Sequence, residues 1–196
     1  MERIQFSKDS EVKLLLQWAG NINLDFSAIL LDYSGFLKTI EDFVFYNPGN
    51  RFPHFDVSLY HTKSNWICKS NPISFDESVQ LILNSEEFEI EDDLCTEILT
   101  INLKKVRSEI KSIAIIASIY DDALTLNQAS HLSLSIRDNN SNSLIFSLVI
   151  NPDDYTSQNA IIIGTIVRNS DDYWYFRNTN IAITGGLKSI IDKFSK

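Results

Sequence analysis

The sequence predicts an all-β fold, a sandwich or a barrel, with little helix. Two apolar segments around a polar turn, 132–137 and 144–150, predict a β-hairpin. Similar short apolar segments recur along the chain and are separated by turn-forming residues, a pattern that is typical of all-β folds. Helical spacing occurs only in 74–84 and 187–194. With 196 residues and a mass of 22.4 kDa, we expect one domain, spanning residues 1–196.

The hairpin is the clearest local signal. Leucine and isoleucine alternate with polar residues over 132–137, so the first strand has one apolar and one polar face. The stretch 138–143 reads Asp-Asn-Asn-Ser-Asn-Ser, residues that hydrogen-bond their own backbone in turns. The second strand, 144–150, is almost entirely apolar.

The other expected strands are short and lie between turns at 32–35, 47–50 and 151–154. In chain order they are 27–31, 43–46, 97–103, 113–120, 160–167 and 173–176.

Two helices are expected. Ser74 is a candidate N-cap for 74–84, in which Val79, Ile82 and Leu83 share one side. Gly185 and Gly186 precede a C-terminal segment whose apolar residues fall on one helical stripe, namely Leu187, Ile190, Ile191 and Phe194.

Residues 51–96 differ from the rest in composition. They contain two of the three histidines, both cysteines, and an acidic run over 86–93. We interpret them as a long insertion, loop or helix, between two strands, and long loops often carry function.

Charge excludes two classes of partner. Seventeen Lys and Arg against 26 Asp and Glu give a net charge of −9 and a pI near 4.7. An acidic chain is poorly suited to neutralising phosphates, so we expect no nucleic acid. There is no polybasic cluster, no signal-peptide core and no run of 18 apolar residues, so we expect a cytoplasmic protein without membrane insertion.

Recognised enzyme templates are missing. The sequence has no GxGxxG, P-loop, GxSxG or HExxH motif, and we expect no enzymatic activity and no catalytic residues. His54, His61 and His131 are too scattered for a metal pair, and Cys68 and Cys95 form no zinc motif. A disulfide between these cysteines is one alternative, and two free thiols are the expectation in a reducing cytosol.

Oxygen-bearing side chains favour calcium among the metals. Asn21, Asn23 and Asp25 alternate and would share one face of an extended segment. Calcium takes six to eight oxygen ligands, and the acidic run 86–93 or Asp121–Asp122 could add more. The competing interpretation is structural, since such residues also form turns and solvated faces, and no EF-hand loop is present.

The order of several motifs resembles a known family. Leu24–Leu31 reads LDFSAILL, Gly35 follows, and Asp42–Asn47 reads DFVFYN. Further matching segments are Ile98–Val106, Ile119–Asp121, Leu126–Gln128, Gly164, Trp174–Phe176 and Gly185–Leu187. Together these segments, within residues 14–194, resemble TerD-type tellurium-resistance and stress-response domains.

The resemblance implies a two-sheet antiparallel β-sandwich that binds calcium through loops at one end, here with a short C-terminal helix and the 51–96 insertion. The sequence departs from the family's metal loops. Asn23 replaces the first Asp of DLD, His61–Asn65 reads HTKSN in place of HSGDN, and the acidic loop has lost its glycines. The nearest ligand set that the resemblance implies is Asn23, Asp25, Asp92, Asp93 and Glu97.

Three functional hypotheses follow. The first is a non-enzymatic TerD-like stress-response module with calcium as its cofactor. The alternative is a protein–protein interaction module whose insertion docks a protein partner after the metal loops have decayed. The apolar residues that would form that contact are Trp66, Ile67, Phe75 and Phe88. An enzyme of unknown class is a third, weaker hypothesis.

Overall fold

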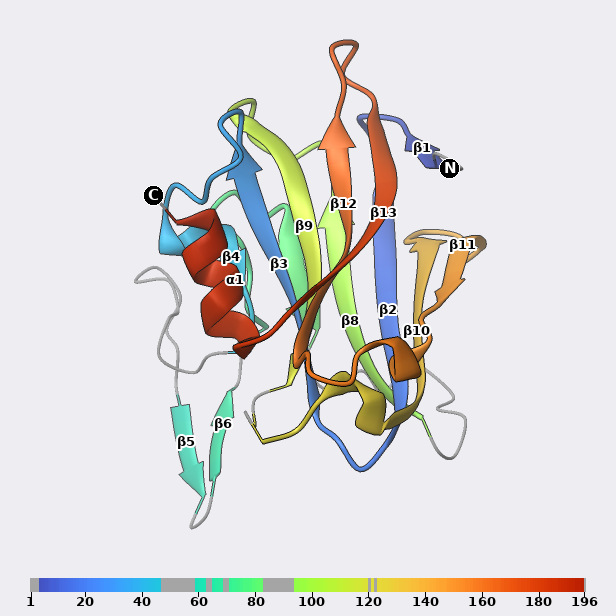
Figure 1. Cartoon of the computed structure of the whole chain (residues 1–196). Coiled ribbons are helices and arrows are strands. Elements are labelled where there is room, and N and C mark those ends of the chain that lie inside the picture. Colours follow the sequence, from blue (N-terminus) through green and yellow to red (C-terminus); the bar gives the residue numbers. More distant parts are fainter. Residues whose placement is uncertain are drawn as a thin grey trace.

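Two antiparallel sheets pack face to face, with one helix on the outside (Figure 1). The computed structural model describes residues 4–46, 59–62, 65–68, 71–82, 94–119, 121 and 123–195, with the backbone alone for 59–62 and 65–68. The two-sheet sandwich and the C-terminal helix are therefore confirmed.

The larger sheet has the strand order β1-β13-β12-β9-β3-β4. Its strands are β1 (Ile4–Phe6), β3 (Leu24–Asp32), β4 (Phe43–Val44), β9 (Ile110–Ile119), β12 (Ala160–Arg168) and β13 (Trp174–Ile183). The smaller sheet has the order β11-β10-β2-β8-β7. Its strands are β2 (Glu11–Gly20), β7 (Val79–Ile82), β8 (Cys95–Asn102), β10 (Ala129–Asp138) and β11 (Leu144–Val149).

Short helices and one further hairpin complete the described elements. The 3-10 turns are η1 (Ile40–Asp42), η2 (Leu126–Gln128) and η3 (Pro152–Asp154). The strands β5 (Leu59–Thr62) and β6 (Asn65–Cys68) form the separate hairpin.

The core lies between the two sheets and follows the alternation of the strands. In β2 the inward residues are Val12, Leu14, Leu16 and Trp18, all buried. On the facing sheet, Phe26, Ala28 and Leu30 of β3 fill the same core. Burying a large apolar side chain contributes about 1.5–3 kcal/mol, so this inner layer is the main stabilising feature of the sandwich.

A second apolar layer forms between the larger sheet and α1 (Gly186–Phe194). Ile29 and Leu31, which alternate with the inward residues of β3, face Ile190 of the helix. The Asn159 side chain holds the start of α1, because its Oδ1 accepts hydrogen bonds from the Gly185 and Gly186 N–H groups at 3.0 and 2.7 Å. Gly185 has φ +97°, a left-handed conformation that glycine adopts readily.

The predicted hairpin is confirmed as β10 and β11, with Leu134 opposite Leu148. Strands overlap each of the other predicted strand segments, although none has the predicted bounds and β4 and β13 differ most. β2 was not among the predicted strands, although its buried residues alternate.

The helix expected over 74–84 is wrong for the described residues. The chain instead makes a turn in which Ser74 Oγ accepts the Ser78 and Val79 N–H groups, and β7 follows. β7 pairs with β8 and buries Val79 and Leu81, two residues apart, in the core. Strand pairing therefore overrides the weak helical spacing.

The expected insertion over 51–96 is also corrected. β7 is the edge strand of the smaller sheet, and β8 begins at Cys95, so part of this segment belongs to the sandwich. The β5–β6 hairpin occupies another part. Within the described residues, no helix combines the length and apolar character needed to cross a membrane.

Candidate metal centre

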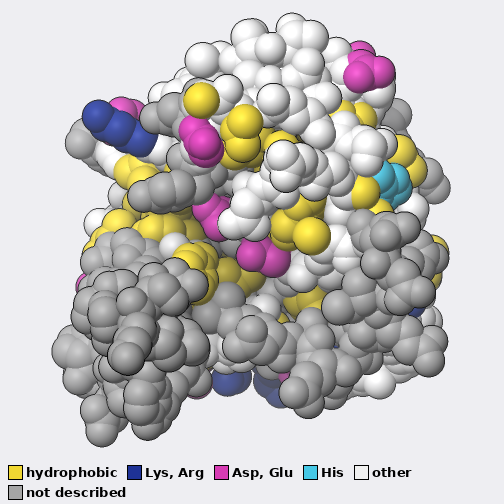
Figure 2. Space-filling view, turned by 90° about the horizontal axis from the view of Figure 1, so that it is seen from below, with side chains coloured by type: hydrophobic (Ala, Val, Ile, Leu, Met, Phe, Trp, Pro, Cys, Tyr) yellow, Lys and Arg dark blue, Asp and Glu magenta, His cyan; other side chains and the backbone are white. Residues whose placement is uncertain are grey.

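Two of the predicted ligands, Asp25 and Glu97, lie at one end of the sandwich on different sheets. Asp25 is the second residue of β3, and Glu97 is the third of β8. From that end, acidic side chains are visible beside hydrophobic ones toward the middle of the face (Figure 2).

Glu97 bridges the two sheets. It lies opposite Leu16 of β2, on the same face of β8 as the core residues Leu99 and Ile101. Its Oε2 accepts a hydrogen bond from the Phe26 N–H of β3 at 2.6 Å. β4 pairs with β3 only at Ala28 and Ile29, so the carboxylate satisfies a donor on the edge of β3 that β4 does not cover. Among the described residues, Oε2 is the oxygen of this carboxylate that accepts a hydrogen bond.

The Asp25 side chain points to the outer face of β3, away from the core between the two sheets. It alternates with the core residue Phe26 and lies opposite Ser118 of β9. Ser27 shares this outer face, and the Ser27 and Ser118 hydroxyls are both buried with no hydrogen-bond partner among the described residues. A buried hydroxyl without a partner is destabilising. This small polar region is therefore suited to a water molecule or a cation that the two hydroxyl oxygens could bind.

The electrostatics of the pair follow from burial. Desolvation raises the pKa of Asp25 from 3.8 to about 6. Burial also raises the pKa of Glu97, from 4.5 to about 7. The Phe26 N–H opposes that shift and the negative charge of Asp25 adds to it, so the two carboxylates are close enough to repel each other. A cation bound beside the two carboxylates would offset the repulsion and part of the desolvation penalty.

The other predicted ligands are not assembled with this pair. Asn23 is exposed in the turn between β2 and β3. Asp92 and Asp93 lie outside the described residues. Asp121 is exposed, and its Oδ1 accepts the Ala123 N–H at 2.9 Å, as in an ordinary turn. Among described residues no group of three or more His, Cys, Asp or Glu side chains could hold a metal ion.

The described residues supply oxygen ligands of the class that calcium prefers, and they do not by themselves make up a complete site. Two carboxylates of raised pKa and two unpartnered hydroxyls are oxygen groups, the class that calcium prefers. Six to eight oxygens are needed, so carbonyls, water, Asn23 or the acidic segment would have to supply the remainder. The family resemblance predicts Asp25 and Glu97 as ligands and does not point to Ser118. Ser118 becomes a candidate because it lies opposite Asp25 in the register of β3 and β9.

At the other end of the sandwich, a buried ion pair has a structural role. Arg107 Nη2 lies 2.7 Å from Oδ1 of Asp42, a side chain with no exposed surface. Burial raises the Asp42 pKa, and the Arg107 guanidinium opposes that shift. The Arg107 N–H also donates to Asp76 Oδ2 at 3.1 Å, which fastens the turn before β7 to the sandwich.

Phe75, one of the residues considered for partner docking, is 57% exposed. The Arg107 guanidinium lies 5.1 Å from the centre of the Phe75 ring. The backbone N–H of Phe75 donates a hydrogen bond to the Glu41 carbonyl at 3.1 Å. These contacts favour local packing for Phe75. The side chains of Trp66, Ile67 and Phe88 lie outside the described residues.

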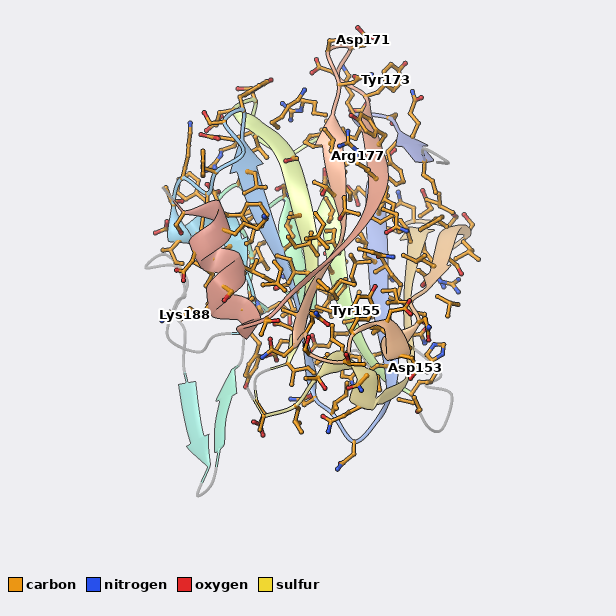
Figure 3. All side chains as sticks on the ribbon, in the orientation of Figure 1. Asp153, Tyr155, Asp171, Tyr173, Arg177 and Lys188 are labelled. Atoms are coloured by element: carbon orange, nitrogen blue, oxygen red, sulfur yellow. The ribbon has the colours of Figure 1, made fainter. Side chains whose placement is uncertain are left out.

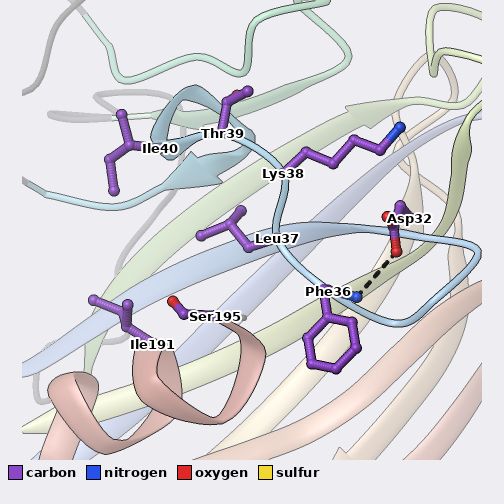
Figure 4. A pocket seen from close by; sticks show the side chains of 8 residues that line it. All are labelled: Asp32, Phe36, Leu37, Lys38, Thr39, Ile40, Ile191 and Ser195. Atoms are coloured by element: carbon purple, nitrogen blue, oxygen red, sulfur yellow. Dashed lines mark hydrogen bonds between the residues drawn. The ribbon is translucent and has the colours of Figure 1, made fainter.

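A surface groove of 540 Å³ lies between the 36–40 segment and the end of α1 (Figure 4). Asp32 and Lys38 are its charged lining residues. Asp32 Oδ1 accepts the Ser34 and Phe36 N–H groups at 2.8 and 3.1 Å, so its carboxylate stabilises the turn after β3. The groove is thus less suited to a cation than the Asp25–Glu97 end.

Comparison with known proteins agrees with this architecture. The family model described as the TerD domain matches residues 3–194. A crystal structure of SAV2460, a protein of unknown function, has a TM-score of 0.65 at 14% identity and covers 97% of this chain and 99% of its own. A homologue of telluride resistance protein, SCO6318 from Streptomyces coelicolor A3(2), has a TM-score of 0.63 at 13% identity, with 93% and 95% covered. No curated protein matched the chain.

Proposed function

Because the chain belongs to the TerD domain family, we propose that it is a non-enzymatic, cytoplasmic stress-response module of the tellurium-resistance type that binds calcium at one end of the sandwich. Asp25 and Glu97 are the central ligands in this proposal. Asn23, Asp92 and Asp93 are additional ligands that the sequence suggests. When bound, calcium supplies positive charge and links oxygen groups of the two sheets.

The observation that carries the proposal is the position of two carboxylates from opposite sheets at one end of the molecule. Burial raises the pKa of both, to about 6 and about 7, so holding them both ionised is unfavourable without a counter-charge. Carboxylates placed in this way gain more from a divalent cation than exposed carboxylates would, because screening by solvent is weaker.

Isothermal titration calorimetry on chelator-stripped protein tests the metal part of the proposal. Calcium should bind the wild type and should bind the Asp25→Asn/Glu97→Gln variant much more weakly. Asp192→Asn, on an exposed helical position, is the matched control and should keep wild-type affinity. Absence of binding to the wild type at millimolar calcium would refute calcium as its ligand.

The stress-response part needs a cellular measurement. Cells that lack the gene should grow more poorly on tellurite, and the wild-type gene should restore growth. If Asp25 and Glu97 matter for this role, the gene that encodes Asp25→Asn/Glu97→Gln should fail to restore growth at equal protein level. Equal tellurite resistance with and without the gene would separate the protein from tellurium resistance and leave the calcium measurement unaffected.

A further inference from the structure

The strand β11 is an exposed edge of the smaller sheet. Among the strands that the structure describes, only β10 pairs with it. It carries three exposed large apolar side chains: Leu144 at 56%, Ile145 at 38% and Val149 at 71%. An apolar edge strand with unpaired backbone groups is a ready site for pairing with another strand.

This edge lacks the usual protections against pairing. Leu144–Val149 reads LIFSLV and contains no charged residue and no proline. The inner face of the strand is fixed, because Phe146 and Leu148 pack against the core and the Phe146 ring lies 5.4 Å from that of Phe176. The outer face, with Ile145, Ser147 and Val149, is therefore held in place while exposed.

We propose that two copies of this chain associate by antiparallel pairing of β11 with β11, about a two-fold axis at Ser147. The strand is self-complementary about this residue, since Ile-Phe precedes it and Leu-Val follows it. In this register Ile145 lies opposite Val149 of the second copy, and Phe146 lies opposite Leu148 of the second copy. Residues directly opposite in antiparallel strands share a face, so apolar residues meet on both faces.

Charged residues next to β11 also favour a second copy of this chain as the partner of this edge. Arg137 lies opposite Leu144, at the beginning of β11, and its Nη1 donates a hydrogen bond to the Asn142 carbonyl at 3.0 Å. Asp153 is exposed just beyond the other end, in η3, and Figure 3 places it below the hairpin. Antiparallel pairing brings the beginning of each strand to the end of the other. Arg137 of each copy is therefore brought toward Asp153 of the other, twice in a symmetric dimer.

The association should be weak and should strengthen with salt. Two short edge strands bury less than the roughly 1,200–2,000 Å² of a standard interface, so dimers should require protein in the range of about 100 µM. Each copy has a net charge of −9, and we expect the screening of this overall repulsion by salt to outweigh the screening of the two Arg137–Asp153 attractions. Docking of a basic partner on the same edge would weaken with salt.

Analytical ultracentrifugation over a range of protein concentrations tests the proposal. The wild type should form dimers that increase with sodium chloride. Ile145→Lys/Val149→Lys and Ile145→Asp/Val149→Asp should each be monomeric, because like charges then lie opposite one another. An equimolar mixture of the two variants should form heterodimers. This rescue depends on the proposed register and also shows that both variants are folded.

Ile181→Lys is the matched control, since Ile181 is 44% exposed on β13 of the other sheet. This variant should dimerise like the wild type. A wild type that stays monomeric in high salt, a mixture that stays monomeric, or a dimer lost in Ile181→Lys and kept in the β11 variants would each overturn the proposal.

Discussion

Burial disfavours the charged form of Asp25, so the effect of replacing this residue on stability should depend on whether calcium is bound. Asp25→Asn removes a carboxylate whose ionisation is disfavoured by burial, so without calcium it should leave the free energy of unfolding unchanged or slightly higher. With excess calcium it should lower the melting temperature relative to wild type, because a ligand stabilises the state that binds it. Thermal unfolding with calcium and with chelator measures both effects. If calcium shifts neither protein, Asp25 is not a ligand.

Glu97 makes the stability of the calcium-free protein depend on pH. A carboxyl group with a raised folded-state pKa contributes stability below its unfolded pKa, and this contribution is lost as pH rises through the folded pKa. For Asp25 and Glu97 the loss runs from about pH 4 to about 6 and from about 4.5 to about 7. The melting temperature should therefore fall by about 5 °C or more between pH 5 and pH 8.

Glu97→Gln keeps an oxygen that can accept the Phe26 N–H and removes the charge. This variant should show a smaller fall in melting temperature over the same pH range, and calcium should reduce the fall in the wild type. A wild-type melting temperature that rises from pH 5 to pH 8 in chelator would contradict the raised pKa values.

Arg107 should matter far more for stability than its neighbour Lys105. Arg107→Met leaves the fully buried Asp42 without its counter-charge, and breaking a buried pair costs about 3–5 kcal/mol. Lys105→Met removes only a pair with Glu77 in which both side chains are about half exposed, expected to be worth less than about 1 kcal/mol. Urea denaturation of both variants measures the difference, and equal losses would contradict a structural role for the buried pair.

At the scale of elements, Gly164 fixes how closely β12 approaches β13. A Cβ at this position would overlap the Phe176 ring and lie 2.8 Å from the Arg177 carbonyl oxygen. Gly164→Ala should therefore lower the free energy of unfolding by about 1–3 kcal/mol, measured by urea denaturation. Phe176→Leu makes room at the same place, so the double variant should lose less stability than the sum of the two single losses. Full additivity would argue against this contact.

The strands whose prediction succeeded are those whose own pattern and final environment agree. The 132–137 segment alternates strictly and has one buried face, so its sequence and its structure show the same period. β2 was missed because Leu15, between the inward Leu14 and Leu16, is also buried, which hides the alternation behind an apolar run. The 74–84 segment is short, and its pairing partner β8 decides between strand and helix.

At the scale of the whole molecule, the candidate metal centre could be predicted only in part. The LDFSA motif predicts Asp25 as a ligand, and Glu97 is predicted as one of the nearest substitutes for the family's acidic loop. Their meeting depends on the packing of two sheets, since Phe26 and Glu97 are 71 residues apart along the chain. The Ser118 hydroxyl depends on strand register in the same way, and no local pattern in the sequence specifies it.

The most direct test of the calcium proposal is the number of protons released when calcium binds. At pH 6 Asp25 is about half protonated and Glu97 is mostly protonated, so binding should release between one and two protons, and at pH 8 it should release almost none. Calorimetry in buffers of different ionisation enthalpy measures this number. The account predicts that the proton release at pH 6 disappears in Asp25→Asn/Glu97→Gln. Calcium binding with the same proton release in wild type and variant, or no calcium binding at all, would contradict it.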